Sequence, residues 1–434
     1  MKKYFLLPLF FSVFTLYSIS VLVVGSGCRE HALVWKLAQS EQVTTIFAAP
    51  GNGGTQKEPK TTNITIAATD IKNLLNFALE KNIDLTIVGP EAPLAEGITD
   101  LFNAHGLHCF GPTKAAAEIE SSKLFAKQFM QKYNIPTAQY QACTSYKQAH
   151  QYIATQHLPI VIKVDGLAAG KGVFVTSTQQ EVDDALDAIF TKKKFGNAGK
   201  KVIIEEYLEG DELSFMVVTD GTTIVSLETS QDYKRRYENN KGPNTGGMGA
   251  ISPSLYSTPE LEETIMNTII VPTVEGLQKE GQEYSGVLYA GIMLTKDGPK
   301  VLEFNCRFGD PETEVLLARL ESDLYQLCSN VVHKKLGNSP LQWKQERAVG
   351  VVMAVEGYPL SYKKGLPIKG LDTKTEALIF HATKQQDDAF VSNGGRVLCV
   401  VGLGTTVQEA RKQAYQTTNT IFWKGKCVRN DIGL

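Results

Sequence analysis

The sequence has almost no net charge and no regular arrangement of cysteines. Its 44 lysines and arginines nearly balance its 46 aspartates and glutamates, which leaves a net charge of -2 in 434 residues. Binding to the phosphates of a nucleic acid needs an excess of positive charge, so that class of function is disfavoured and small-molecule partners are favoured. The seven cysteines are odd in number and form no CxxC pair. This argues against a disulfide framework and a zinc site, and favours a reducing compartment.

The chain also has no long hydrophobic run after its first twenty residues. Lys2, Lys3 and the apolar run 4–19 look like a secretory signal, but no small-x-small cleavage site follows. The run is also short for a membrane span, which needs about 20 residues. We therefore expect residues 1–20 to be a hydrophobic extension that does not work as an export signal, and the protein to be cytoplasmic.

After residue 20, short β-rich runs that end in Gly or Pro alternate with helical patterns. This order predicts an α/β fold that begins with a doubly wound parallel sheet, whose ligands lie beyond the carboxyl ends of the strands. A chain of this length is expected to form about three domains. We place them at 21–122, at 123–336 with most of the Gly-rich loops, and at 345–434, which is richer in strands.

The first Gly-rich turn is GSGCREH, which begins at Gly25. A dinucleotide-binding turn has a third glycine where Glu30 stands, and an acidic residue where the second strand ends in Pro50. NAD binding is therefore disfavoured. A turn that binds phosphate at a helix N-terminus remains possible, and so does a strand-to-helix turn that only needs glycine. The loop PGNGGT, which begins at Pro50, could lie on the same rim.

A second motif is VIKVDGLAAGKGV, residues 161–173. It is not a P-loop, because Gly172 stands where the magnesium-binding Ser or Thr belongs. Lys163 in a strand pattern and Lys171 in a glycine loop instead suit a nucleoside triphosphate that is held from two sides. The alternative for Lys163 alone is a strand lysine that extends its ammonium group to solvent.

The stretch VIIEEYLEGDELS, residues 202–214, reads as a strand, a short hinge and a second strand. Such a hinge can offer backbone groups to an adenine edge, and Glu212 can accept bonds from ribose hydroxyls. By itself it is also compatible with a plain hairpin that carries solvated acids.

The strongest motif is VLEFNCRFGDPETE, residues 301–314. Glu303 and Asn305 are two apart in a strand, so both side chains point to one face and could bind Mg²⁺. Three further charged residues, Arg307, Asp310 and Glu312, crowd the turn that follows, which a purely structural turn rarely needs. The loop GPNTGGMG, residues 242–249, adds backbone donors suited to covering phosphates.

Together these stretches resemble the phosphoribosylamine-glycine ligase family of ATP-grasp enzymes over about residues 21–433. The matching motifs are GSGxREHA, APGNxGT, TIVGPEAPL, VIKxDGLAAGKGV, SQDxKR, GPNTGGMGA, EFNCRFGDPETE and NGGRVL. The resemblance implies a two-step ligation in purine biosynthesis. Glycine attacks the γ-phosphate of ATP, which gives glycyl phosphate and ADP, and the amine of 5-phosphoribosylamine then displaces phosphate.

The resemblance also implies site residues. Phosphates of ATP would be held by Lys123, Lys163, Gly170, Lys171 and Gly172, and the nucleoside by Glu205, Glu206, Leu208 and Glu212. Mg²⁺ or Mn²⁺ would be bound by Glu303 and Asn305. The catalytic groups would be Lys171, Asp232, Arg307, Asp310 and Glu312. The two acceptor substrates would also contact Asn244 and Thr245, and the ribose phosphate would meet Gly25, Ser26, Gly27, Gly51, Asn52, Gly53 and Arg396.

This chain departs from the family pattern at Cys28, usually a glycine, and at Tyr233, usually a histidine. It also stops at Leu434, where the family continues with a short tail. Aligning the family's start, Met-Lys-Val-Leu-Val, on Val21 places its initiator at Ile19, so residues 1–18 look like an addition.

The implied partners are glycine and 5-phosphoribosylamine, with no nucleic acid, no membrane and a monomer or weak dimer. Two alternatives remain open. One is a different ATP-grasp carboxylate-amine ligase or carboxylase, and the other is an exported nucleotide-binding module without catalysis.

Overall fold

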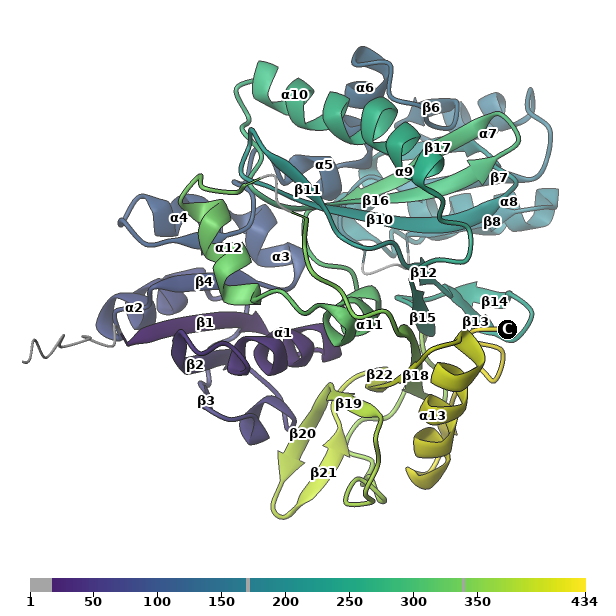
Figure 1. The fold of residues 1–434 in the computed structure, drawn as a ribbon. Coiled ribbons are helices and arrows are strands. Elements are labelled where there is room, and N and C mark those ends of the chain that lie inside the picture. The colour runs from purple at the N-terminus through teal and green to yellow at the C-terminus, as the bar shows by residue number, and fades with distance from the viewer. Residues whose placement is uncertain (1–17, 169–171, 338–339) are drawn as a thin grey trace, which may run out of the picture.

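The computed structural model describes residues 18–168, 172–337 and 340–434 (Figure 1). The expectation that residues 1–20 are not an export signal falls almost entirely outside this part of the chain. So do the roles predicted for Gly170 and Lys171. None of the helices among the described residues is long and apolar enough to cross a membrane.

The N-terminal part is a five-stranded parallel sheet in the order β3-β2-β1-β4-β5, so the expected doubly wound sheet is confirmed. Its strands are β1 (Ile19–Gly25), β2 (Val43–Pro50), β3 (Thr61–Asn63), β4 (Leu85–Val88) and β5 (Cys109–Phe110). Its helices are α1 (Cys28–Ala38), α2 (Ile71–Glu80), α3 (Glu91–Glu96) and α4 (Ile98–Asn103). Residues 21–24 of the central strand are fully buried, as expected for a strand covered on both faces.

The third strand is shorter than the sequence predicts. The run NITIAAT, residues 63–69, has a strand pattern, but β3 ends at Asn63. After a last backbone bond from Ile64 N to Ala48 O, the chain leaves the sheet edge. Ile66 N donates to Ile64 O within its own segment, and Pro50, the last residue of β2, has no N–H with which to continue the ladder.

The central part contains two antiparallel four-stranded sheets, at the top of Figure 1. One has the order β6-β9-β7-β8 and consists of β6 (Tyr140–Cys143), β7 (Ile160–Val164), β8 (Val173–Thr176) and β9 (Val202–Glu206). The other has the order β11-β10-β16-β17 and consists of β10 (Asp211–Thr219), β11 (Ile224–Ser226), β16 (Gly286–Thr295) and β17 (Gly298–Asn305). The predicted strand, hinge and second strand over 202–214 are therefore β9, a turn and β10.

Helices accompany these sheets. They are α5 (Glu118–Ser121), α6 (Lys123–Lys132), α7 (Tyr146–Ile153), α8 (Gln179–Leu186), α9 (Pro259–Ile265) and α10 (Val271–Lys279). Short helical turns add η1 (Thr55–Lys57), η2 (Asp187–Thr191), η3 (Gly196–Lys200) and η4 (Met266–Ile270). A small hairpin is formed by β13 (Arg235–Tyr237) and β14 (Lys241–Asn244). Its second strand includes the first three residues of the GPNTGGMG loop.

The C-terminal sheet combines strands that are distant in the sequence. Its order is β12-β15-β18-β22-β19, with β23 paired to β18. The last four of these strands in sequence are β18 (Arg347–Val355), β19 (Leu378–His381), β22 (Arg396–Gly404) and β23 (Lys426–Cys427), whereas β12 (Gln231–Asp232) and β15 (Gly249–Ser252) come from the central part. The remaining elements are α11 (Glu312–Arg319), α12 (Leu324–Val332), α13 (Val407–Thr420) and the hairpin β20 (Thr383–Gln386) with β21 (Ala389–Ser392).

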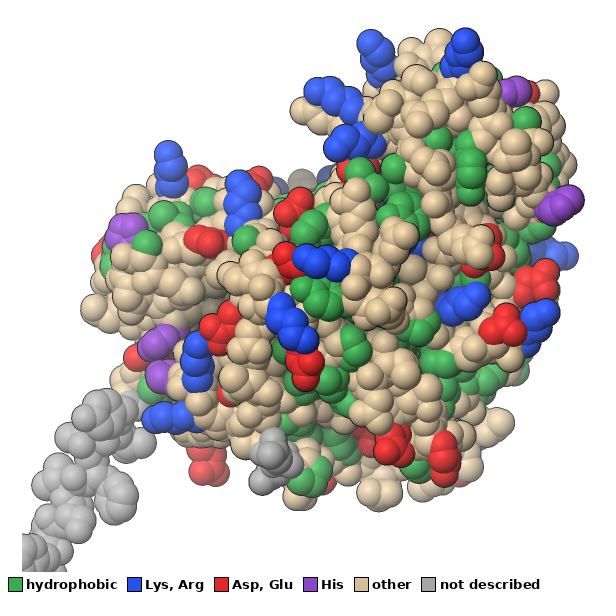
Figure 2. Space-filling view, turned by 90° about the horizontal axis from the view of Figure 1, so that it is seen from above, with side chains coloured by type: hydrophobic (Ala, Val, Ile, Leu, Met, Phe, Trp, Pro, Cys, Tyr) green, Lys and Arg blue, Asp and Glu red, His purple; other side chains and the backbone are tan. Residues whose placement is uncertain are grey.

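The hydrophobic core is continuous across these parts. One buried cluster joins the N-terminal sheet to α11, α12 and the C-terminal sheet, and another joins the same N-terminal sheet to α6, α10, β10 and β16. On the face in Figure 2, acidic and basic side chains are interspersed, in agreement with the small net charge.

Candidate active site

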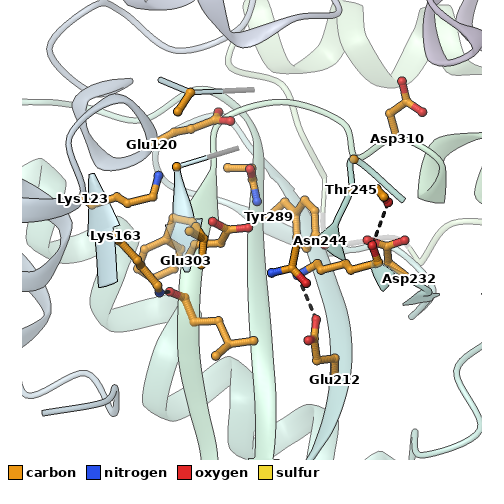
Figure 3. Close-up of a pocket in the computed structure, with 18 of the residues that line it drawn as sticks. Glu120, Lys123, Lys163, Glu212, Asp232, Asn244, Thr245, Tyr289, Glu303 and Asp310 are labelled. Atoms are coloured by element: carbon orange, nitrogen blue, oxygen red, sulfur yellow. Dashed lines mark hydrogen bonds and ion pairs between the residues drawn. The ribbon is translucent and has the colours of Figure 1, made fainter. Parts of the chain in front are cut away.

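A cavity of about 780 Å³ lies where the central sheets meet the first turn and the start of β22 (Figure 3). It brings together most of the residues that the motifs predict: Gly27, Lys123, Lys163, Gly172, Glu205, Glu206, Leu208, Glu212, Asp232, Asn244, Thr245, Glu303, Asn305, Arg307, Asp310, Glu312 and Arg396. In the view of Figure 3, Glu303 lies between the two labelled lysines on one side and Asp232 on the other.

Five of the predicted ribose-phosphate residues do not belong to the described lining of this cavity: Gly25, Ser26, Gly51, Asn52 and Gly53. The side-chain amide of Asn52 forms all of its hydrogen bonds with backbone groups of the protein. Its Nδ2 donates to Ser26 O at 3.1 Å, to Gly27 O at 3.0 Å and to His381 O. Its Oδ1 accepts from two backbone N–H groups of its own loop. The loop therefore fastens the first turn to β19 in this structure, and its contact with substrate stays a prediction.

The side chain of Glu30 forms hydrogen bonds within the turn that follows β1. Glu30 Oε2 accepts from Gly27 N at 2.5 Å, and its Oε1 pairs with Arg29 Nε at 2.6 Å. A Cβ on Gly89 would lie 2.0 Å from Glu30 Oε1. Glu30, which stands where a dinucleotide turn has its third glycine, thus fills the space against the end of β4, and this supports the argument against NAD.

The loop that follows β7 fixes the start of α6. Asp165 Oδ1 accepts from Ser122 Oγ at 3.0 Å and from Leu124 N at 3.1 Å, while Ser122 caps the helix by accepting from Phe125 N. Because Lys123 is the first residue of α6 and Lys163 belongs to β7, this contact sets the two lysines beside one another at the cavity.

Glu205 lies buried between two lysines. Its Oε2 is 3.0 Å from Lys163 Nζ and 3.2 Å from Lys127 Nζ, and each of the three side chains is less than a tenth exposed. Lys163 also donates to Leu302 O at 3.0 Å. Lys163 is therefore held in place by a carboxylate and a carbonyl, and the interpretation as a solvated strand lysine is wrong.

Glu303 and Asn305 project from β17 into the cavity, as the alternation of the strand predicts. Burial acts to raise the pKa of the Glu303 carboxyl, but the net pKa is lowered by the charges of Lys234, Lys123, Lys163 and Arg307. Asn305 Oδ1 accepts from Arg307 Nη2 at 3.0 Å. The described residues contain no group of three or more His, Cys, Asp and Glu side chains that could hold a metal ion. A cation here would therefore be held by few protein oxygens, which is how Mg²⁺ usually binds beside phosphates.

Carboxyl groups crowd the opposite side. Glu312 Oε1 accepts from Tyr289 Oη at 2.5 Å and from Ser214 Oγ at 3.1 Å. Asp232 Oδ1 is buried without a hydrogen-bond partner among the described residues. Burial first, and then the charges of Glu312 and Glu212, raise the pKa of the Asp232 carboxyl well above its ordinary value. Asp232 can therefore hold a proton at a pH where an exposed aspartate has lost it.

Arg396 joins three segments at the edge of the cavity. Its Nη1 is 3.0 Å from Asp310 Oδ1, and it donates to Asp310 O at 2.7 Å and to Gly246 O. The first residue of β22 thus holds the RFGDPE turn and the GPNTGGMG loop together. Glu314, in the first turn of α11, is fully buried with both carboxyl oxygens unpartnered in the described structure.

Several lining residues were not predicted from the sequence: Arg29, Glu91, Glu120, Lys127, Lys234 and Tyr289. Lys234 Nζ pairs with Glu212 Oε2 at 2.9 Å, and Arg307 Nη2 pairs with Glu120 Oε1 at 3.0 Å. A signal existed for Lys127, because it follows Lys123 by four residues and so lies on the same helix face. Arg29, Glu91 and Lys234 stand within the motifs GSGxREHA, TIVGPEAPL and SQDxKR, whereas Glu120 and Tyr289 are brought in by tertiary packing.

Three family profiles match this chain in sequence order. The phosphoribosylglycinamide synthetase N domain matches residues 19–120, the ATP-grasp (A) domain of the same synthetase matches 121–313, and its C domain matches 348–434.

Whole proteins match as well. A phosphoribosylamine-glycine ligase of Vibrio parahaemolyticus is 51% identical over 417 residues, which is 95% of this chain and 97% of that protein. The enzyme of the same name from Escherichia coli K12 is 50% identical over 418 residues, with the same two coverages.

Solved structures agree. The phosphoribosylamine-glycine ligase of Thermotoga maritima superposes with a TM-score of 0.81 at 33% identity and covers 95% of this chain and all of its own. A biotin carboxylase complex from Campylobacter jejuni reaches a TM-score of 0.73 at only 14% identity, with 96% of this chain and 95% of that chain covered. This second likeness is one of fold alone.

Proposed function

Since this chain belongs to the phosphoribosylglycinamide synthetase family, we propose that its cavity joins glycine to 5-phosphoribosylamine at the expense of ATP. The chain is an ATP-dependent ligase of purine biosynthesis. The observation that carries the proposal is the division of one cavity into a side with buried lysines and a side with crowded carboxyl groups, with Glu303 between them.

The first step forms a mixed anhydride. A glycine carboxylate oxygen attacks the γ-phosphorus of ATP, the bond to the β-phosphate oxygen breaks, and ADP leaves with that electron pair. In the second step the amine attacks the carbonyl carbon of glycyl phosphate, phosphate leaves, and the nitrogen loses a proton. Neither step needs a nucleophile from the protein, so catalysis consists of positioning and charge neutralisation.

The one cysteine that lines the described cavity agrees with this. Cys28 is almost fully buried, its Sγ donates to Phe380 O at 3.3 Å, and burial raises the pKa of its thiol well above the ordinary value. A thiol kept neutral in this way is a poor nucleophile.

ATP occupies the lysine side in this proposal. Lys123 and Lys163 contact its phosphates, together with the loop of Gly170, Lys171 and Gly172. The nucleoside lies against Glu205, Glu206, Leu208 and Glu212, which come from β9, the hinge and the start of β10. The backbone groups of the hinge would form hydrogen bonds with the edge of the adenine ring.

Glu303 and Asn305 would hold the divalent cation, Mg²⁺ or Mn²⁺. The donor set fits, since both are hard oxygen ligands on one strand face and the lowered pKa of Glu303 keeps its carboxylate charged. When bound, the cation supplies neutralisation of phosphate charge during transfer.

The acceptor substrates lie on the carboxyl side, against Asp232, Asn244, Thr245, Arg307, Asp310 and Glu312. Arg307 orients the glycine carboxylate, and Asp232 takes the proton that the attacking amine loses. Its raised pKa makes the Asp232 carboxylate a stronger base than an exposed aspartate. Arg396, with Gly27 and the neighbouring turns at Gly25, Ser26, Gly51, Asn52 and Gly53, takes the ribose phosphate.

We also propose the partners, the oligomeric state and the cellular location of the enzyme. Its partners are the small molecules glycine and 5-phosphoribosylamine, and the protein works as a monomer or weak dimer in the cytoplasm, where ATP and the labile ribosylamine are found. Intact-mass analysis with cell fractionation tests the location. A mature chain that starts near Val21 in an exported fraction contradicts it.

The direct test of function is ADP formation by the purified protein with ATP and Mg²⁺. We expect ADP to form only when glycine and 5-phosphoribosylamine are both present, with one ADP for each glycinamide ribonucleotide. Omitting each substrate in turn is the control. Equal turnover with bicarbonate in place of glycine would contradict the assignment and favour an ATP-grasp carboxylase.

A further inference from the structure

Lys127 is a buried lysine whose hydrogen-bonding capacity is already used by the protein. Its Nζ lies 3.2 Å from Glu205 Oε2, and it donates to Thr137 Oγ1 at 2.8 Å and to Ala138 O at 3.3 Å. An ammonium group has three protons, and three acceptors surround this one. Although Lys127 borders the cavity, it has no proton left to offer a ligand.

Lys163 differs from Lys127 although it shares the same carboxylate oxygen. Within the described part of the chain, its Nζ has two acceptors, Glu205 Oε2 at 3.0 Å and Leu302 O at 3.0 Å. It comes from β7, opposite the helix that carries Lys127, and both side chains are almost fully buried. Lys163 can therefore donate one more hydrogen bond to a ligand in the cavity, whereas Lys127 donates all three of its hydrogen bonds to protein groups.

The charges of this trio decide what Lys163 can do. Two ammonium groups and one carboxylate leave a single positive charge, and in a buried place that charge acts strongly on nearby phosphate oxygens. Without Lys127, Lys163 and Glu205 would form a neutral pair, and a phosphate would have to compete with Glu205 for the same ammonium group.

We propose that Lys127 is a positioning residue for nucleotide binding: it neutralises Glu205, so that the positive charge of Lys163 remains available to the phosphates of ATP. This inference rests on the proposed function only in taking the bound molecule to be a nucleoside triphosphate. It assigns Lys127 a part in binding the nucleotide and none in the chemistry of ligation.

The titration of Lys127 gives the proposal a distinctive signature. The pKa of Lys127 is lowered to about 8, because burial and the charge of Lys163 outweigh the opposite effects of Glu205 and Glu206. The ring of Tyr140 also faces the ammonium group, at 5.8 Å. Since the charged form does the neutralising, nucleotide affinity is expected to fall as pH rises through about 8.

The test is calorimetric binding of MgADP and MgATP, without glycine or 5-phosphoribosylamine, between about pH 6.5 and pH 9.5. The proteins are wild type, Lys127→Met, Lys127→Arg and the control Lys132→Met. Lys132 belongs to the same helix, but its side chain is 62% exposed and pairs with Glu280 on the surface. Thermal unfolding of each variant separates lost binding from lost structure.

We expect Lys127→Met to raise the dissociation constant at pH 7 about tenfold or more, because breaking a buried charge pair leaves Glu205 to Lys163 alone. Lys127→Arg should bind nearly as wild type at pH 7 and lose the weakening above pH 8, because a guanidinium stays charged. Lys132→Met should match wild type throughout. In steady state, Lys127→Met should raise KM for ATP much more than it lowers kcat.

Wild-type affinity in a folded Lys127→Met overturns the proposal, and so does an unchanged alkaline decline in Lys127→Arg. If Lys127→Met does not fold, the pH profile of Lys127→Arg still decides. Since the binding experiment contains no acceptor substrate, it can succeed or fail independently of the ligase assignment.

Discussion

The two sides of the cavity are both buried, yet their acidic groups have opposite protonation tendencies. Where the lysine side borders the carboxyl side, Glu303 is surrounded by cations and the pKa of its carboxyl is lowered despite burial. On the carboxyl side, Asp232 lies near other carboxylates, and burial raises its pKa well above the ordinary range, as it does for Glu314, which is buried outside the cavity lining. The difference shows that burial alone does not set the charge of a group. The nearest counter-charges decide it.

This contrast corresponds to two chemical tasks. A polyphosphate needs fixed positive charge and a cation ligand that stays ionised, which the lysine side provides. An amine nucleophile must lose a proton, so a carboxyl group with a raised pKa, which binds a proton more readily, is useful on the other side. Four substitutions test whether the two sides are as different as their electrostatics indicate.

The largest effect is expected for Glu303→Gln. It removes a charged cation ligand and leaves the side-chain size unchanged, so activity should fall about 1,000-fold, which is the scale of several kcal/mol of lost charge stabilisation. The measurement is kcat at saturating Mg²⁺, together with MgADP binding. Glu283→Gln, at an exposed surface carboxylate, is the control. Activity near wild type would mean that β17 does not carry the metal site.

Asp232→Asn is expected to lower kcat about 100-fold, the usual contribution of a general base. In wild type, kcat/KM should rise with pH through a value above the ordinary aspartate pKa, because the base must lose its proton. This rising limb should disappear in the variant, while Asp297→Asn in an exposed turn keeps it. A limb that survives in Asp232→Asn would assign the titration to another group and weaken the contrast between the two sides.

Lys171→Met tests whether the glycine loop belongs to the lysine side. Lys171 lies outside the described residues, so this prediction rests on the sequence, where a fixed charge in a glycine loop suits phosphate oxygens. We expect KM for ATP to rise about tenfold. Lys57→Met is the comparison, because Lys57 is exposed and lies 4.3 Å over the ring of Phe390. Equal and small effects would make Lys171 a solvated lysine.

The smallest effect is expected for Glu314→Gln, and it concerns stability. A carboxyl whose pKa is higher in the folded than in the unfolded chain contributes stability below the unfolded value of about 4.3, and loses it as pH rises toward the folded value. The amide does not titrate. The variant should therefore be the more stable protein at pH 8 and lose that advantage near pH 4, as thermal unfolding would measure. A less stable variant at pH 8 would mean that Glu314 is ionised and pairs with Arg396 or Arg29.

The fold and the family were accessible from the sequence because they depend on local patterns. Buried strands that end in Gly, the strand-hinge-strand over 202–214 and the alternation that puts Glu303 and Asn305 on one face are each encoded within a few residues. The predicted parallel sheet with β1 inside it was confirmed. The domain boundaries and the roles of the site residues stay predictions.

What the sequence could not predict depends on contacts between distant segments. Asp165 accepts hydrogen bonds from Ser122 and Leu124 at the start of the helix that begins with Lys123, Glu205 is shared by two lysines, and the amide of Asn52 fastens the first turn to β19. Each is a single side chain whose partner is brought close by packing. Without that packing, Glu205 reads as one of several solvated acids and Asn52 as one residue of a flexible loop.

The C-terminal sheet limits how this enzyme can be cut and recombined. Ala250 of β15 pairs with Gly350 of β18, and β12, which carries Asp232, is the next strand in that sheet. A chimaera that takes residues 345–434 from a relative would therefore change the support of an active-site aspartate more than a hundred positions earlier in the chain. The unit that can be exchanged intact is discontinuous, with residues 231–252 and the last ninety or so inherited together.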